Sequence, residues 1–230
     1  MSSRKNSACY KCGQPATTRE HFPPKSFFPA GGNLQLKTVR SCFAHNNSKS
    51  GDDQYILTQI CINAGKAENL AKQIFMRSVV PQLERSIAFR EMLNRDAEWL
   101  ENGARRYPVD IARFDNFFDS LSCAVFFDRF GCQFDPSTHT LRHIYMSLTS
   151  DDPYDQAHKQ FISQAMSYFF QHHREQIEHF DAARIDEIVY ANDVLAPAGI
   201  TASVTIGHSF YGVFEVISLM TRKPPQGVAL

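Results

Sequence analysis

Two pairs of metal-ligand side chains near the N-terminus constrain the fold of this chain more than any other feature. Cys9 and Cys12 form a C-x-x-C pair, and Cys42 and His45 form a second pair with the same spacing. Two intervening residues let both ligands of a pair face one tetrahedral ion, and Gly13 suits the tight turn after the first pair. The sequence therefore predicts a structural zinc site that joins two distant segments, with four unrelated residues as the alternative.

The chain between the two pairs has the pattern of a strand, a turn and a second strand. Glu20 and His21 precede two prolines and a Ser-Phe-Phe run, and residues 30–33 form an Ala-Gly-Gly-Asn turn signal. Residues 34–40 then alternate in part between apolar and polar side chains. From about His45 onward, asparagine and serine residues suited to capping predict a helix. The expected product is a ββα unit held together by zinc.

These motifs resemble the HNH endonuclease family over roughly the first quarter of the chain. Glu20 and His21, with Pro24 shortly after, stand in the place of the family's acidic-His-x-x-Pro element. Residues 42–49 read Cys-x-x-His-Asn-x-x-Lys, in the place of the family's C-x-x-C-N/H-x-x-K element. The resemblance implies a ββα-metal fold in which zinc is structural and a second divalent ion takes part in catalysis.

The chain departs from the family pattern at two positions. His45 stands where most zinc-bearing members have cysteine, which keeps zinc binding possible but changes the charge of the site. The family's middle asparagine has Asn33 as its nearest candidate, whereas an ungapped count back from Asn46 reaches Lys37. The role of that asparagine is therefore carried to Asn33 only as an expectation.

The resemblance implies a metal-dependent endonuclease that hydrolyses phosphodiester bonds of DNA. His21 is the expected general base, because the unperturbed pKa of histidine lies near neutral pH. Glu20 and Asn46 are the expected oxygen ligands of a catalytic Mg²⁺ or Mn²⁺, and Asn33 is a further catalytic candidate. The expected phosphate contacts come from Lys49, Lys25 and Arg40. The alternative for each of these residues is an ordinary surface or helix-capping role.

Charge is distributed unevenly between the two parts of the chain. Residues 1–50 contain eight lysines and arginines against one glutamate, a net charge of +7, while the whole chain is neutral, so the remainder carries −7. A basic segment of this size favours contact with phosphate backbones, of DNA or alternatively of RNA. A zinc-stapled module that binds nucleic acid or protein without catalysis is the alternative function.

The pattern after the motifs predicts an α+β fold: an HNH-like module over residues 1–54 and a mostly α-helical domain over residues 55–230 with a C-terminal β-meander. Pro81 is expected to interrupt one helix, and a further helix is expected to run through Trp99. The most apolar helix is expected over Val109–Phe130, at the centre of the second domain. The remaining expected elements are a long helix over 153–180, a strand or helix over 141–148, and strands over 185–194, 200–206 and 211–220.

Targeting and partners are predicted from what the sequence lacks. No segment has the apolar run of a signal peptide or the length needed to cross a membrane, so no membrane contact is expected. Cysteines without an export signal indicate a reducing compartment, and a cytoplasmic location is predicted. Besides nucleic acid, the expected partner of the helical domain is a second copy of the chain or a targeting or regulatory protein.

Overall fold

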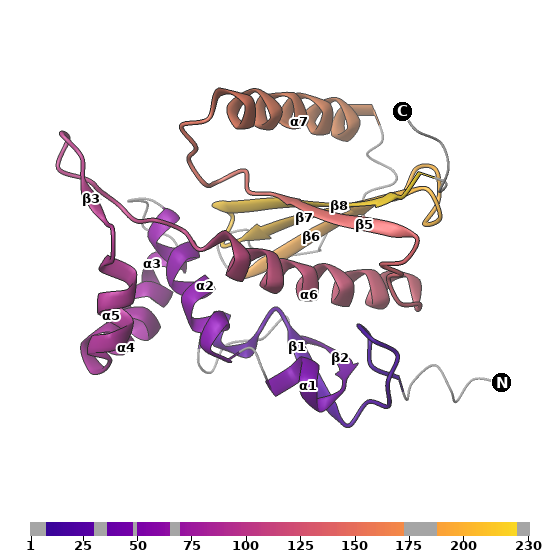
Figure 1. Cartoon of the computed structure of the whole chain (residues 1–230), viewed down its shortest axis with the longest axis horizontal. Coiled ribbons are helices and arrows are strands. Elements are labelled where there is room, and N and C mark those ends of the chain that lie inside the picture. Colours follow the sequence, from indigo (N-terminus) through magenta and orange to yellow (C-terminus); the bar gives the residue numbers. More distant parts are fainter. Residues whose placement is uncertain (1–7, 30–35, 48–49, 65–69, 173–187, 225–230) are drawn as a thin grey trace.

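The computed structural model describes residues 8–29, 36–47, 50–64, 70–172 and 188–224. It contains helices and strands in a mixed order, with a small N-terminal unit against one side of a larger helix–sheet layer (Figure 1). Among the described residues, no helix combines the length and the apolar character that crossing a membrane requires.

The N-terminal unit contains the strands predicted between the two ligand pairs. β1 (Thr18–Phe22) pairs antiparallel with β2 (Lys37–Ser41), in a register that sets Glu20 opposite Val39. A 3₁₀ turn over Lys25–Phe27 follows β1, and the helices α1 (Phe43–Asn47) and α2 (Ser50–Asn63) follow β2. The 30–33 turn signal lies outside the described residues. Helix α2 runs across the domain boundary that was expected at residue 54.

The expectation that Pro81 interrupts a helix is wrong. The segment is continuous from α3 (Leu70–Ile74) through a π-helical turn at Phe75–Val79 into α4 (Val80–Arg85). Pro81 lies in the first turn of α4, directly after the widened π turn, where a missing N–H and a bulky ring are tolerated.

The expectation of a helix that runs through Trp99 is also wrong. Helix α5 (Ile87–Asn94) ends earlier, and Trp99 belongs to a two-residue strand, β3 (Glu98–Trp99), that pairs with β4 (Arg105–Arg106). The Arg105 guanidinium lies 5.5 Å from the centre of the Trp99 ring, a cation–π contact that offers the indole a partner without burial.

Helix α6 (Ile111–Phe130) is the predicted apolar helix, and the prediction is confirmed. It begins where the Asp110 side chain accepts a hydrogen bond from the Arg113 N–H, and it ends at Gly131, whose φ of +66° is the left-handed conformation that glycine adopts without strain. Its buried side chains form the centre of the core: Phe114, Phe117, Phe118, Leu121, Val125 and Phe126.

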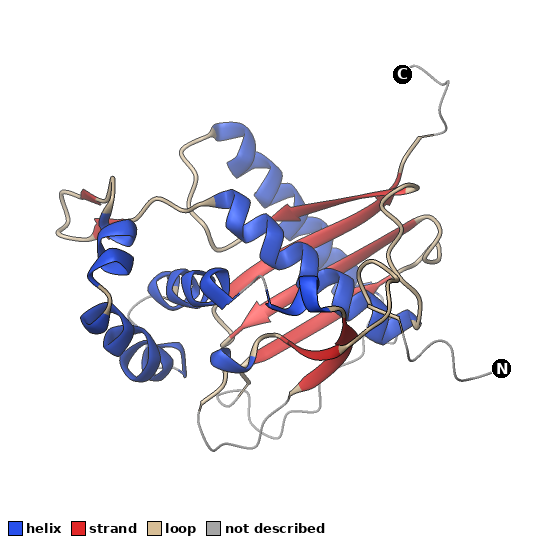
Figure 2. Cartoon of the chain, turned by 60° about the horizontal axis from the view of Figure 1, so that its bottom comes forward, coloured by secondary structure: helices blue, strands red, loops and turns tan. Residues whose placement is uncertain are grey.

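The sheet has four antiparallel strands rather than the three expected. The predicted segments form β6 (Tyr190–Leu195), β7 (Ser203–Phe210) and β8 (Phe214–Arg222), and β5 (His139–Ile144) joins them in the order β5-β8-β7-β6. Helix α6 covers one face of this sheet, and α7 (Pro153–His172) lies over the other face (Figures 1 and 2). The part of the predicted 153–180 helix beyond residue 172 lies outside the described residues.

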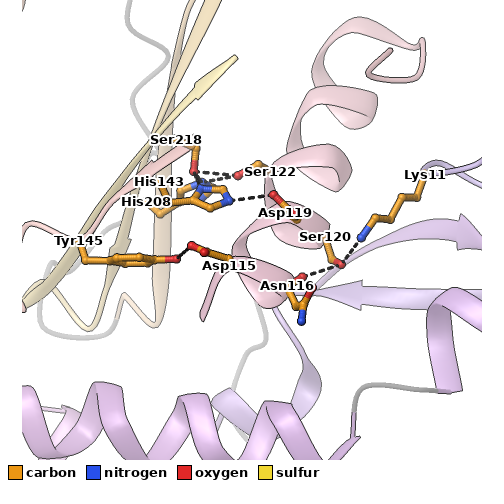
Figure 3. A network of polar contacts seen from close by, with 10 residues as sticks. All are labelled: Lys11, Asp115, Asn116, Asp119, Ser120, Ser122, His143, Tyr145, His208 and Ser218. Atoms are coloured by element: carbon orange, nitrogen blue, oxygen red, sulfur yellow. Dashed lines mark hydrogen bonds and ion pairs between the residues drawn. The ribbon is translucent and has the colours of Figure 1, made fainter. Parts of the chain in front are cut away.

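A buried polar network fills the interface between α6 and the sheet (Figure 3). His208 contacts Ser122 and Ser218 through Nε2, at 3.0 Å each, and the Tyr190 hydroxyl through Nδ1, at 2.7 Å. All four side chains are buried. Burial, together with nearby His143, lowers the pKa of His208 from 6.5 to about 3, so the imidazole remains neutral inside the folded protein.

The lowered pKa of His208 predicts that the folded protein loses stability as the pH falls. Below pH 6.5 the unfolded His208 takes up a proton while the folded one does not, so stability present above pH 6.5 falls by roughly 1.4 kcal/mol per pH unit down to about pH 3. In His208→Gln this loss should disappear, although the variant should be less stable at pH 7 because the network is incomplete. Chemical denaturation across this pH range measures it, with His139→Gln as the control; equal pH slopes in wild type and His208→Gln would contradict the expectation.

Candidate metal centre

The first ligand pair lies on a tight turn whose backbone is fixed by its own hydrogen bonds. The Cys9 N–H donates to the Gln14 carbonyl at 2.7 Å, and the Gly13 N–H donates back to the Cys9 carbonyl at 3.1 Å. Gly13 lies in this turn, as its position in the sequence predicted, and has φ +73°, a left-handed conformation that glycine adopts without strain. The turn directs Cys12 outward, where it is exposed, while Cys9 is buried.

The second ligand pair lies where β2 passes into α1. Cys42 directly follows β2, and the N–H groups of His45 and Asn46 both donate to its carbonyl at 3.2 Å. These bonds form the first turn of the helix and bring the His45 ring to the same side as the Cys42 thiol. Strand, cysteine and helix start are therefore consecutive, so the position of α1 is fixed by the same residues that supply the ligands.

The structure brings the four predicted ligands into one cluster. The ligand atoms of Cys9, Cys12, Cys42 and His45 all lie within 4.8 Å of one another. The Cys12 and Cys42 sulfurs are 3.8 Å apart, and His45 Nδ1 lies 3.5 Å from Cys9 Sγ and 3.3 Å from Cys42 Sγ. Zinc–sulfur bonds of about 2.3 Å in a tetrahedron require sulfurs roughly 3.8 Å apart. The cluster can therefore hold a metal ion such as zinc.

The protein environment affects the two thiols of the first pair differently. Burial would raise the pKa of Cys9, but backbone hydrogen bonds from Cys42, Cys12 and Lys11 and the His45 side chain outweigh it and lower the pKa from 9.0 to about 6. The pKa of Cys12 is raised by desolvation and by the neighbouring thiols. Of these two thiols, Cys9 is therefore more readily available as a thiolate, the form that binds metal.

Residues outside the predicted ligand set fix the cluster to the rest of the chain. Tyr10, between the two cysteines, is fully buried and donates its backbone N–H to the Arg40 carbonyl at 2.9 Å. The Gln133 amide donates to the Cys9 carbonyl at 2.7 Å, and Lys11 donates to Ser120 of α6 at 2.9 Å (Figure 3). Only Tyr10 has a local signal, an aromatic ring inside a C-x-x-C pair; the others are contacts across long sequence distances.

Glu20 and His21 point to opposite faces of β1, as the alternation of a strand requires. On one face, Glu20 accepts a hydrogen bond from the Tyr10 hydroxyl at 3.2 Å. On the other face, His21 lies opposite Thr38 of β2. The desolvated Tyr10 has a pKa raised by burial and by the Glu20 charge, so its hydroxyl stays protonated and acts as the donor.

The face that carries His21 is basic. Arg19 lies two residues before His21 and is opposite Arg40 in the β1–β2 register, so Arg19, His21, Thr38 and Arg40 share one face. Both arginines are exposed, and no ion pair to either is found within the described residues. Like charges directly opposite on a sheet repel each other, so this pair favours an anionic partner. Arg19 was not predicted as a site residue; the β-register alone identifies it.

Asn46 lies against the same strand. Its Nδ2 donates to the Arg19 carbonyl at 3.3 Å, which directs the other amide atom, Oδ1, away from that carbonyl. Of the predicted phosphate contacts, Lys25 and Arg40 are exposed. Lys49 and Asn33 lie outside the described residues. Asn46 therefore contacts the residue that directly precedes the Glu20-His21 pair. It does so from α1, whose first turn is formed by Cys42 and His45.

A Ser-His-Asp arrangement elsewhere in the molecule has the composition of a hydrolase triad. His143 contacts Ser218 through Nδ1 at 2.8 Å and Asp119 through Nε2 at 3.0 Å (Figure 3). Ser218 belongs to β8 and has no exposed surface, and its hydroxyl accepts a hydrogen bond from Ser122 of α6. A substrate carbonyl cannot reach its hydroxyl in this fold, so the arrangement is part of the buried polar network and not a nucleophilic site.

A cavity of about 670 Å³ lies away from the cluster, between β5, α7 and the start of α6. Two of its cations are already neutralised, since Arg106 pairs with Asp151 at 2.9 Å and Lys159 pairs with Asp155 at 2.8 Å. None of the predicted site residues lines it.

No protein-family model matches the chain, and comparisons with curated proteins and with solved structures likewise found no match. Function is therefore inferred from the side chains and their geometry.

Substitution of Cys12 tests the metal centre with little effect on packing, because this side chain is exposed. Cys12→Ser should lose most of its zinc and melt roughly 10 °C lower, as expected for about 3 kcal/mol in a chain of this size. Elemental analysis and thermal melting measure both effects, and Cys132→Ser, which replaces a cysteine outside the cluster, serves as the control. Full zinc content in Cys12→Ser would show that this thiol is not a ligand.

Proposed function

We propose that this protein is a metal-dependent endonuclease of the HNH type that hydrolyses phosphodiester bonds of DNA. The observation that carries the proposal is the shared face of β1 and β2, where His21 lies beside the facing pair of exposed arginines, Arg19 and Arg40, on a strand contacted by the helix that follows Cys42. A base and two uncompensated cations on one exposed surface suit a phosphodiester backbone. In this proposal the cluster holds structural zinc, and the β1–β2–α1 unit is a ββα-metal module.

In the proposed reaction, His21 accepts a proton from the water that attacks phosphorus. Arg19 and Arg40 bind the phosphate oxygens and orient the backbone for in-line attack. Glu20 and Asn46 are the proposed oxygen ligands of Mg²⁺ or Mn²⁺, with Asn46 Oδ1 directed away from the Arg19 carbonyl. When bound, such an ion stabilises negative charge on the phosphate and on the leaving oxygen. Lys25, exposed after β1, adds a phosphate contact.

A second candidate function is a zinc-stapled module that binds nucleic acid without cleaving it. The observation that favours it is the position of Glu20, whose carboxylate accepts the Tyr10 hydroxyl on the face opposite His21. An acidic side chain held there serves the packing of the first ligand turn as readily as it serves a metal ion. Both candidates use the basic face, so binding and cleavage have to be measured separately.

Binding is tested by removing the two arginines. Arg19→Gln/Arg40→Gln should weaken DNA binding at low salt and reduce the slope of log affinity against log salt by about 1.8, or roughly 0.9 per lost phosphate contact. Fluorescence anisotropy with a labelled duplex over a salt series measures this, and Arg90→Gln/Arg222→Gln removes the same charge from exposed positions elsewhere. An unchanged slope in the first variant would exclude this face as the DNA contact.

Cleavage is tested with supercoiled plasmid in the presence of Mg²⁺, Mn²⁺ or a chelator. Wild type should nick the plasmid with either ion, and His21→Ala should be slower by at least about 100-fold, the usual contribution of a general base. His139→Ala, which removes a histidine from the edge of the distant sheet, should keep wild-type activity. Elemental analysis confirms that each variant retains zinc. Zinc-loaded wild type that binds DNA but never nicks it would favour the binding module.

A further inference from the structure

Helix α7 has two faces of different character. One face is turned toward the rest of the molecule, where Lys159 pairs with Asp155 and donates to the Leu148 carbonyl at 2.8 Å, and where Ile162 and Met166 are partly buried. The opposite face carries large aromatic side chains on the surface: Tyr154 is 79% exposed, Phe161 65% and Tyr168 64%. The helix therefore presents large aromatic side chains on the side that faces away from the sheet.

The exposed aromatic side chains form a single straight row. Tyr154, Phe161 and Tyr168 are spaced seven residues apart, and seven residues drift by only about 20° around an α-helix. At these exposed fractions, three aromatic side chains present roughly 400 Å² of surface, which is more than isolated surface aromatics present. A second helix is the partner whose shape matches a row of this spacing.

The row is symmetric about its middle residue. When a second copy of α7 is laid antiparallel about a two-fold axis at Phe161, Tyr154 of one copy meets Tyr168 of the other. The two small residues beside the axis, Ala157 and Ala165, then face each other and let the helices approach closely. A surface that matches itself under a two-fold rotation is the requirement for an isologous dimer.

Charge and area also fit a second copy as the occupant. The ammonium of Lys159 and the carboxylate of Asp155 pair with each other away from the row, so two copies meet without like charges. Two rows bury roughly 800 Å² in aromatic side chains, and the flanking residues bring the total toward the roughly 1,000 Å² of a specific interface.

We propose that α7 is the dimerisation helix of this protein and that two copies pair antiparallel with Phe161 at the two-fold axis. The metal centre lies on the other side of the sheet from α7 (Figure 1). Dimerisation through α7 therefore leaves the basic faces of both copies exposed at opposite ends of the assembly. The dimer is independent of the nuclease proposal, and either can fail without the other.

The mass of the zinc-loaded full chain in solution tests the pairing. Light scattering after gel filtration at tens of micromolar should give twice the mass of one chain for wild type. Phe161→Glu should give the monomer mass, with dimer affinity reduced at least 100-fold, because two carboxylates would meet at the axis. Gln160→Glu adds the same charge to the neighbouring exposed position, off the row, and should remain dimeric. Far-UV circular dichroism verifies that both variants are folded.

Cross-linking tests the antiparallel arrangement without removing an aromatic side chain. A mixture of Ala157→Cys and Ala165→Cys proteins should form a disulfide-linked dimer under mild oxidation, above the background of wild type, whereas either protein alone should not. A monomeric wild type, or a Phe161→Glu variant that stays dimeric, overturns the proposal. Efficient cross-linking of Ala157→Cys alone would indicate parallel helices and overturn the arrangement.

Discussion

The packing of α6 between two partners determines how the rest of the chain is arranged. On one side, Phe117 stacks on Phe27 from the N-terminal unit, with ring centres 5.5 Å apart. On the other side, Phe118 packs edge-on against Phe210 of the sheet at 6.1 Å. These adjacent side chains point to different neighbours, so a single helix forms the core of both units. Burial of a large aromatic side chain contributes about 2–3 kcal/mol, so α6 is the element that joins the N-terminal unit to the sheet.

The shared helix has a consequence for the metal centre. Small metal-stapled modules often depend on the ion for most of their stability, because they are too small to bury a core of their own. Here the turn that carries Cys9 is also held by Gln133 and Ser120, and Phe27 and Tyr10 are buried in the common core. The metal is therefore expected to fix the local position of α1 against β1, while α6 supports the unit as a whole.

Local pattern predicted the elements whose signal lies within a few residues. The ligand spacing of Cys9 and Cys12 identified the first turn, and phenylalanine at helical intervals identified α6. The failures come from contacts made across the chain. β5 was ambiguous because only its pairing with β8 makes it a strand, and Pro81 was read as a break because a π turn has no local signal. Arg19 was overlooked for the same reason, since its position opposite Arg40 depends on the register of two strands.

The strand geometry that revealed Arg19 also limits what the Glu20-His21 pair can do. Successive side chains of β1 alternate between faces, so the carboxylate and the imidazole cannot both point straight at the same ligand. The imidazole shares its face with two exposed arginines, while the carboxylate is engaged by Tyr10, which is buried beside the cysteines. In the proposed nuclease, the phosphate therefore contacts the His21 face, and a catalytic ion bound to Glu20 lies at the edge of the strand rather than over that face. The hydrogen bond from Tyr10 to Glu20 also connects β1 to the metal turn. A change at Glu20 would act on β1 and on the metal turn together, whereas a change at His21 leaves the metal turn in place.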